Sequence, residues 1–345
     1  MIEGHVQGLA NTRALGQAGI PVVVIDKDIC IARYSKYCKG FFRCPDYRTE
    51  DFVTFLTNLA ISENLGGWML LPSNDHAVHT ISKFRDQLSK HFKIVTPGID
   101  IIDNIYKKHR LLDIAKRIHI PIPETWYPTA VSELKQDDFV FPVMVKGKEG
   151  LTFYKTTGKK VFIADDLQEL VAIYKQMPSA LAVTDTFIQE IIPTDENNKT
   201  ISFTAFCIKG EIKSHWTGVK LREHPAKFGT ATYTKSIVND TVYRLSVSLL
   251  RELNYTGVCE VEYLLDHRTG TYKLIEINAR TWLWVGLAIA CGINYPVMIY
   301  NYLNEIEQEY PSSYKIDTMW MNRVTDMAHA IKSILKGNLS IVDYI

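Results

Sequence analysis

The chain has 345 residues, 46% of them hydrophobic and 22% charged, so it is long enough for two or three domains with cores of their own. Lys and Arg number 39 and Asp and Glu number 38, a balance that excludes a polybasic nucleic-acid binder and an acidic tail protein. The sequence has no run of about 18 apolar residues and no secretory signal at its start, which predicts a cytoplasmic protein without a membrane anchor.

The first hundred residues alternate between apolar strands and helices. The expected strands cover residues 20–26, 68–72 and 93–95, and the expected helices cover about 4–18 and 76–90. Alternation of this kind predicts a doubly wound parallel sheet. Only Met1, Ile2 and Glu3 precede the first glycine, so the first strand of such a sheet is expected to be missing. Asp75, in the loop after a parallel strand, is a candidate on the substrate side because ligands bind at that end of such sheets.

Two weaker patterns in the sequence give little information about function. The six cysteines are scattered without a C-x-x-C pair, so we expect free thiols rather than a zinc site. Gly4 and Gly8 lack the third glycine and the preceding strand of a dinucleotide-binding fingerprint.

From about residue 107 the pattern changes. A helix expected at 107–118 ends at Pro121 and Pro123, because proline breaks a helix. The strands expected beyond it cover 141–146, 161–163, 187–193, 202–208, 211–217, 257–265 and 272–277, and the helices cover 165–176 and 241–253. Lys209-Gly210 predicts a hairpin turn. The polar segment 147–160 is expected to be flexible.

Charged and amide side chains gather on the last two of these strands. Glu260 and Glu262 share one face of the first strand, and Glu276, Asn278 and Arg280 share one face of the second, because strand side chains alternate. Clustered carboxylates need a cation to neutralise them, and oxygen ligands without Cys or His favour Mg²⁺. An exposed hairpin with ordinary charges is the alternative reading.

With the spacing E-x-E followed by E-x-N-x-R, the chain resembles the ATP-grasp superfamily, whose hallmark includes E-x-N-P-R. It is similar to the carboxylate–amine ligase branch, which includes D-aspartate ligase and carbamoyl-phosphate synthetase large-subunit-like proteins. The resemblance implies an α/β pre-ATP-grasp domain at 1–105 and a two-lobed α+β ATP-grasp domain at 106–302, with lobes at about 120–189 and 190–302. A C-terminal helical extension is expected at 303–345.

The resemblance also implies roles for individual residues. Glu262 with Glu276, and Glu276 with Asn278, are expected to hold two Mg²⁺ ions, with Mn²⁺ as a substitute. Arg280 is expected to stabilise the γ-phosphoryl group of ATP and an acyl-phosphate. The other candidates are Lys108, Lys146 and Lys160 for ATP, Glu190 and Ile192 for adenine, Asp195 or Glu196 for ribose, and Lys220 and Arg222 near the phosphates.

The sequence departs from the family pattern in two places. Ala279 stands where the superfamily has proline, which loosens the turn without removing a ligand. Trp282 and Trp284 follow Arg280 where relatives more often carry small residues, and they are expected to narrow or reshape the acceptor side.

The expected activity is an ATP- and Mg²⁺-dependent ligation of a small carboxylate to a small amine, with ADP and phosphate as products. Two alternatives of the same fold are a carboxylase that uses carboxyphosphate and a small-molecule kinase. A third is an ATP-binding module without chemistry. The resemblance leaves a homodimer open and gives no nucleic-acid or membrane partner.

Overall fold

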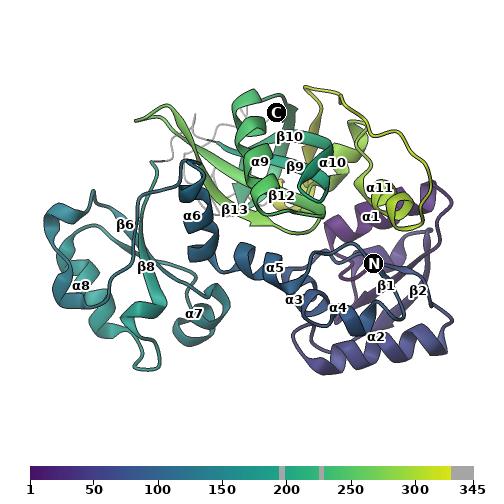
Figure 1. The fold of residues 1–345 in the computed structure, drawn as a ribbon, viewed down its shortest axis with the longest axis horizontal. Helices are drawn as coiled ribbons and strands as arrows, with labels where there is room; N and C mark the ends of the chain where they lie inside the picture. Colours follow the sequence, from purple (N-terminus) through teal and green to yellow (C-terminus); the bar gives the residue numbers. More distant parts are fainter. Residues whose placement is uncertain (194–198, 225–228, 328–345) are drawn as a thin grey trace. The chain divides into compact units, whose positions relative to one another are not determined.

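The computed structural model of the chain describes residues 1–193, 199–224 and 229–327. These residues form two compact units, each built from segments that are separated in the sequence. The first unit comprises Met1–Ile102, Lys199–Val261 and Asn278–Ile345, and the second comprises Asp103–Asn198 and Glu262–Ile277. Figure 1 follows the chain through both units.

The N-terminal part of the first unit is a parallel α/β arrangement. Strand β1 (Val22–Asp26) pairs in parallel with β2 (Cys38–Arg43), and β3 (Met69–Leu70) pairs in parallel with β4 (Lys93–Ile94). Ile2 forms parallel bridges to Ile25 and to Pro72, so it connects the two strand pairs. A bridging residue therefore stands where the sequence analysis expected a missing strand.

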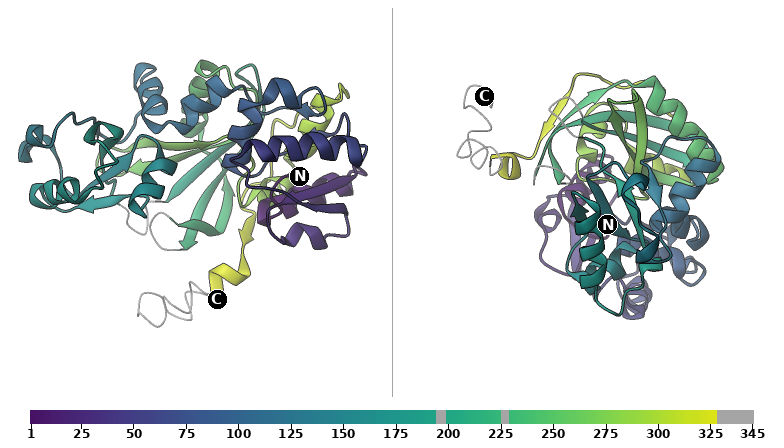
Figure 2. Two further views of the ribbon diagram at one scale, coloured as in Figure 1. Left: turned by 90° about the horizontal axis from the view of Figure 1, so that it is seen from below. Right: turned by 90° about the vertical axis from the view of Figure 1, so that its left-hand side faces the viewer.

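Helices accompany these strands. They are α1 (Val6–Gln17), α2 (Glu50–Ser62), α3 (Asp75–Lys83), α4 (Arg85–Leu88) and, after β4, α5 (Ile99–Tyr106). Apolar side chains of α2, among them Phe52 and Leu56, pack with Ile2 and Ile25 in one core, and Figure 2 shows these elements together in purple and blue. The sequence analysis predicted neither α2 nor β2.

The second unit contains a four-stranded antiparallel sheet in the order β5-β8-β6-β7. Its strands are β5 (Thr125–Trp126), β6 (Val143–Gly147), β7 (Phe162–Ala164) and β8 (Thr186–Glu190), and its helices are α6 (Lys108–Arg117), α7 (Gly150–Thr157) and α8 (Leu167–Gln176). Asp166 caps α8 by accepting from the backbone N–H of Glu169. The segment 147–160, expected to be flexible, contains helix α7 instead.

A second sheet has six strands in the order β13-β12-β9-β10-β11-β14. They are β9 (Thr200–Ile208), β10 (Glu211–His224), β11 (Thr230–Ile237), β12 (Gly257–Asp266), β13 (Thr271–Asn278) and β14 (Met319–Met321). The predicted hairpin turn at Lys209-Gly210 is confirmed: both residues have positive φ, 50° and 79°, as a two-residue turn of this kind requires.

Helices and a tryptophan cluster cover this sheet within the first unit. Helix α9 (Asp240–Glu252) packs on β9 and β10, whereas α10 (Val285–Ala290) and α11 (Tyr295–Leu303) pack against α1 (Figure 1). Trp216, Trp282 and Trp284 are fully buried in the core of the unit.

The segment after α11 matches the expected helical extension at residues 323–327, which are helical, but not before them. Residues 304–318 contain no helix in the structure, and Met319–Met321 form strand β14, which pairs antiparallel with β11. Residues 328–345 lie outside the described part of the chain. No helix among the described residues is long and apolar enough to cross a membrane.

Candidate active site

A carboxylate and two lysines lie together in the second unit. Nζ of Lys108, the first residue of α6, lies 3.2 Å from Oε2 of Glu276 on β13. Lys146 on β6 donates from Nζ to Oε1 of Gln189 on β8 at 3.0 Å. Burial, assisted by the positive charge of Lys108, lowers the pKa of Lys146 to about 7, while Glu276 opposes the shift. Lys108, Lys146 and Glu276, which the resemblance assigns to ATP and metal binding, therefore interact electrostatically.

This arrangement is suited to an anion. Two ammonium groups in a partly buried site repel each other, and this repulsion favours the loss of a proton from one of them. A phosphate oxygen beside both lysines would restore the charged form of Lys146, because an opposite charge nearby stabilises that form. The pair Lys108 and Lys146 is therefore a candidate phosphate-binding pair.

Further predicted residues are held within the first unit. Asn278, the last residue of β13, donates from Nδ2 to Oε2 of Glu260 on the neighbouring strand β12 at 2.9 Å. Arg280, two residues further on, donates from Nε and Nη2 to the two carboxylate oxygens of Asp75, at 2.8 and 2.9 Å. Asp75, predicted on the substrate side, is thus the partner of the predicted phosphoryl-binding arginine.

The predicted metal ligands have the donor atoms that Mg²⁺ prefers. Glu262, a buried residue of β12, and Glu276 offer carboxylate oxygens, and Asn278 offers an amide oxygen. Within the described part of the chain, no three His, Cys, Asp or Glu side chains gather into a metal site. This donor set fits Mg²⁺, which is usually held by one or two carboxylates together with substrate phosphates.

Glu190, predicted to contact adenine, is engaged by charged partners at the end of β8. Its carboxylate pairs with Lys273 on β13 and, at 2.6 Å, with Arg268, and it accepts from the backbone N–H of Glu124 at 2.9 Å. Burial opposes ionisation, but these partners hold the pKa of Glu190 below its usual value. Its side chain is therefore engaged by partners within the second unit.

The sequence analysis missed the partners of Glu190. Asp266 is fully buried and pairs with Lys273 at 2.9 Å and with Arg268 at 2.7 Å, so four charges form one network. The sequence analysis assigns no role to Asp266 and Arg268, which lie between the strands expected at 257–265 and 272–277. The signal that could have found the network is Lys273, a cation within a strand whose neighbour Leu274 is buried.

The remaining predicted residues lie elsewhere. Arg222 on β10 forms a bidentate pair with the buried carboxylate of Asp326, at 3.0 and 2.7 Å, and its guanidinium lies over the ring of Tyr233. Lys220 lies two residues before it on β10, where the pairing with β11 is irregular. Ile192 is buried and Lys160 is exposed. Asp195 and Glu196 lie outside the described residues.

The two tryptophans lie in the core and are not exposed. Trp282 and Trp284 are each only 1% exposed, and both contact Trp216, with ring centroids 6.1 and 5.2 Å apart. Their rings fill the core of the first unit. Aromatic side chains this large are buried for their apolar area.

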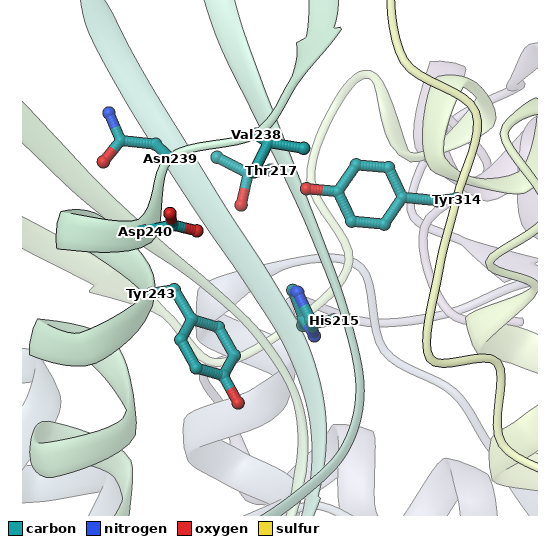
Figure 3. A pocket seen from close by; sticks show the side chains of 7 residues that line it. All are labelled: His215, Thr217, Val238, Asn239, Asp240, Tyr243 and Tyr314. Atoms are coloured by element: carbon teal, nitrogen blue, oxygen red, sulfur yellow. The ribbon is translucent and has the colours of Figure 1, made fainter.

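One pocket is separate from these residues. It measures about 180 Å³ and is lined by His215, Thr217, Val238, Asn239, Asp240, Tyr243 and Tyr314 (Figure 3). None of the predicted site residues belongs to this lining. The pocket therefore lends no support to the predicted site.

Comparison with known proteins identifies relatives. Residues 216–293 match the ATP-binding domain of the carbamoyl-phosphate synthase L chain. The chain is 24% identical to D-aspartate ligase of Enterococcus faecium, with 80% of this chain and 69% of that protein covered.

Solved structures share the fold at low sequence identity. An L-amino acid ligase from Bacillus licheniformis matches with a TM-score of 0.65 and 16% identity, over 88% of this chain and 73% of that one. A second match is the biotin carboxylase domain of 2-oxoglutarate carboxylase from Hydrogenobacter thermophilus, in complex with MgADP and bicarbonate. It has a TM-score of 0.68 and 17% identity, over 91% of this chain and 71% of that one. The predicted fold class and the predicted resemblance are confirmed, and the names of the ligases agree with the predicted class of enzyme.

Proposed function

We propose that this chain joins a small carboxylate to a small amine at the expense of ATP. The proposal is supported by the match to an ATP-binding domain and by the similarity to D-aspartate ligase and to an L-amino acid ligase. The proposed products are an amide, ADP and phosphate. The activity requires Mg²⁺, for which Glu262, Glu276 and Asn278 supply the oxygen ligands.

One observation carries the proposal: the ion pair between Lys108 and Glu276, with Lys146 close enough for its pKa to be lowered by the charge of Lys108. The site thus holds cations for phosphate oxygens beside a carboxylate for a metal ion. Phosphoryl transfer needs such positioning and charge neutralisation, and it needs no protein nucleophile.

The reaction runs in two steps. An oxygen of the substrate carboxylate attacks the γ-phosphorus of ATP, the bond to the β,γ-bridging oxygen breaks, and ADP leaves with that electron pair. The amine then attacks the carbonyl carbon of the acyl-phosphate, phosphate leaves, and the amine nitrogen gives up a proton. Lys108 and Lys146 hold the phosphate oxygens in line for the first step, and Arg280 has the role that the resemblance implies, stabilisation of the γ-phosphoryl group. Bound Mg²⁺ would neutralise charge on the phosphates.

The other candidate residues complete the proposed ATP site. The backbone near Glu190 and Ile192 is proposed to bind adenine, and Asp195 or Glu196 is proposed to bind ribose. Lys220, Arg222 and Lys160 remain proposed phosphate contacts. Arg222 must leave Asp326 to serve in this way, because both of its paired nitrogens are engaged.

A second candidate reaction is carboxylation, because a biotin carboxylase domain that holds bicarbonate shares the fold. In that case bicarbonate takes the place of the substrate carboxylate in the first step. Bicarbonate dependence distinguishes this reaction from amide formation.

The test measures ADP release from Mg-ATP with pooled amino acids, small carboxylates, bicarbonate and alcohols, each with and without added amines. Release that needs both a carboxylate and an amine supports the ligase. Release that needs bicarbonate supports the carboxylase, and release with a single alcohol acceptor supports a kinase. Binding of Mg-ATP without ADP release under any of these conditions contradicts all three and favours a binding module.

A further inference from the structure

Arg280 is held by a carboxylate that lies 205 residues away in the sequence. Its Nε donates to Oδ1 of Asp75 at 2.8 Å and its Nη2 donates to Oδ2 at 2.9 Å. Its Nη1 donates to the backbone oxygen of Thr281 at 3.1 Å. A bidentate carboxylate pair fixes the plane of a guanidinium as well as its position.

Asp75 is itself fixed by the local structure. It is the first residue of α3, and the preceding residue, Asn74, caps that helix by accepting from the backbone N–H groups of His76 and Ala77, at 2.8 and 3.2 Å. Nδ2 of Asn74 donates to Oε1 of Glu3 at 2.8 Å. The loop after β3 is thereby tied to the loop after Ile2, and both belong to the same compact unit as Arg280.

The pairing affects the orientation of Arg280 more than its attraction for an anion. A guanidinium on a long stem loses rotamer freedom when it binds an anion at one place, and Asp75 removes that freedom in advance. The negative charge of Asp75 at the same time reduces the net positive charge beside Arg280. Loss of the charge of Asp75 should therefore impair the reaction without weakening ATP binding.

We propose that Asp75 is a positioning residue that holds Arg280 in the orientation from which it meets the transferring phosphoryl group. This inference rests on the proposed function. It assigns to the N-terminal α/β part of the chain, through α3, a direct influence on the chemistry of the E-x-N-x-R segment.

The first experiment detects the pairing of Arg280 with Asp75 by NMR and does not depend on enzymatic activity. In protein labelled with ¹⁵N-arginine, the Nε–H of Arg280 should give a signal protected from exchange with water, and Arg280→Lys assigns that signal by removing it. We expect Asp75→Asn to abolish the protection. A protected signal that persists in Asp75→Asn overturns the inference.

The second experiment measures ADP release and Mg-ATP affinity on the same variants. We expect Asp75→Asn to lower kcat at least tenfold, with the dissociation constant for Mg-ATP unchanged within threefold, and Asp75→Glu, which keeps the charge, to recover part of kcat. In an Arg280→Lys background, Asp75→Asn should cause no further loss. A matched control is Asp46→Asn, since Asp46 forms a similar bidentate pair with Arg48 on the surface; this variant should keep full activity.

The outcomes separate the inference from the proposed function. If the wild type releases ADP and Asp75→Asn keeps its kcat, the inference fails and the function stands. An additional loss in the Arg280→Lys background also contradicts it, because the two residues would then act independently. If the wild type releases no ADP with any acceptor, the proposed function fails and the positioning role fails with it.

Discussion

At the scale of single residues, Lys146 is the group whose charge we expect to respond to a bound nucleotide. Its pKa is lowered to about 7 by burial and by Lys108. At pH 8 most of this lysine is therefore neutral, and a bound phosphate raises its pKa again. We expect the protein to take up a proton when it binds Mg-ATP at pH 8, and the affinity to fall above pH 7 by up to about tenfold per pH unit.

Calorimetry in buffers of different ionisation enthalpy measures this proton uptake. Lys146→Met should eliminate it, whereas Lys175→Met, which removes an exposed lysine of α8, should leave it unchanged. Equal proton uptake in the wild type and in Lys146→Met would show that another group titrates.

Glu276 carries two proposed roles, as partner of Lys108 and as metal ligand. The side chains of Lys108 and Glu276 are both more than a third exposed. Glu276→Gln should therefore lower the free energy of unfolding by less than about 1 kcal/mol. Turnover should fall by about 100-fold or more, because an electrostatic group at the reacting phosphate is lost. ADP release and urea denaturation on the same preparation check both expectations.

Glu211→Gln is the matched control for this variant, because Glu211 also forms a surface ion pair, with Lys213 at 2.7 Å. It should leave turnover unchanged. Wild-type turnover in Glu276→Gln would exclude Glu276 from the metal site.

At the scale of the elements, the network of Glu190, Asp266, Arg268 and Lys273 joins β8 to the hairpin of β12 and β13. The Lys273 side chain is 10% exposed, and its two carboxylate partners are buried. Lys273→Met should therefore cost about 3 kcal/mol of unfolding free energy at pH 7, because two buried carboxylates lose the more buried of the two cations that they share with Arg268. Lys213→Met, at an exposed pair, should cost less than about 1 kcal/mol.

The same network predicts a dependence on pH. The partners hold the pKa of Asp266 and of Glu190 below their usual values. Such carboxylates stabilise the fold fully above their unfolded pKa of about 4, and this stabilisation is lost as the pH falls toward their lower folded values. Urea denaturation between pH 6 and pH 3 should show a steep loss for the wild type and a shallower one for Lys273→Met. Equal slopes would mean that the network does not set the acid limit.

Elements with local signals could be predicted from the sequence. The helix expected at 165–176 corresponds to α8, and Lys209-Gly210 marked the turn between β9 and β10. Helix α7 was missed because its sequence is rich in threonine and flanked by glycine, and β14 was missed because three residues gain strand structure only by pairing with β11. Short strands of this kind depend on distant partners rather than on propensity.

In the candidate site, too, local patterns could be predicted from the sequence and contacts between distant residues could not. Alternation along β13 predicted that Glu276 and Asn278 share a face. The partners could not be predicted, because Lys108 and Glu276 are 168 residues apart and no local pattern encodes such a pairing. A single sequence states which residue types are present, and the fold decides which of them meet.

At the scale of the whole molecule, the chain passes between the two compact units three times after leaving the first, at residues 198–199, 261–262 and 277–278. The second unit therefore depends on Glu262–Ile277, which brings Asp266, Arg268 and Lys273 to Glu190. We expect a fragment of residues 103–198 alone to be largely unfolded, because its buried Glu190 lacks these cations.

A chimera that links residues 103–198 to 262–277 through a short flexible connection should fold. Circular dichroism melting and the dispersion of amide proton signals distinguish the two fragments. Cooperative melting of 103–198 alone would show that the network is dispensable.

The three stacked and edge-on indoles of Trp216, Trp282 and Trp284 have an optical consequence. Their ring centroids lie between 5.2 and 6.4 Å apart in a rigid core, close enough for their electronic transitions to couple. The folded protein should show a strong near-ultraviolet circular dichroism band that vanishes when this core loosens. Integrity of the six-stranded sheet can thus be followed in any variant by spectroscopy alone, without a label.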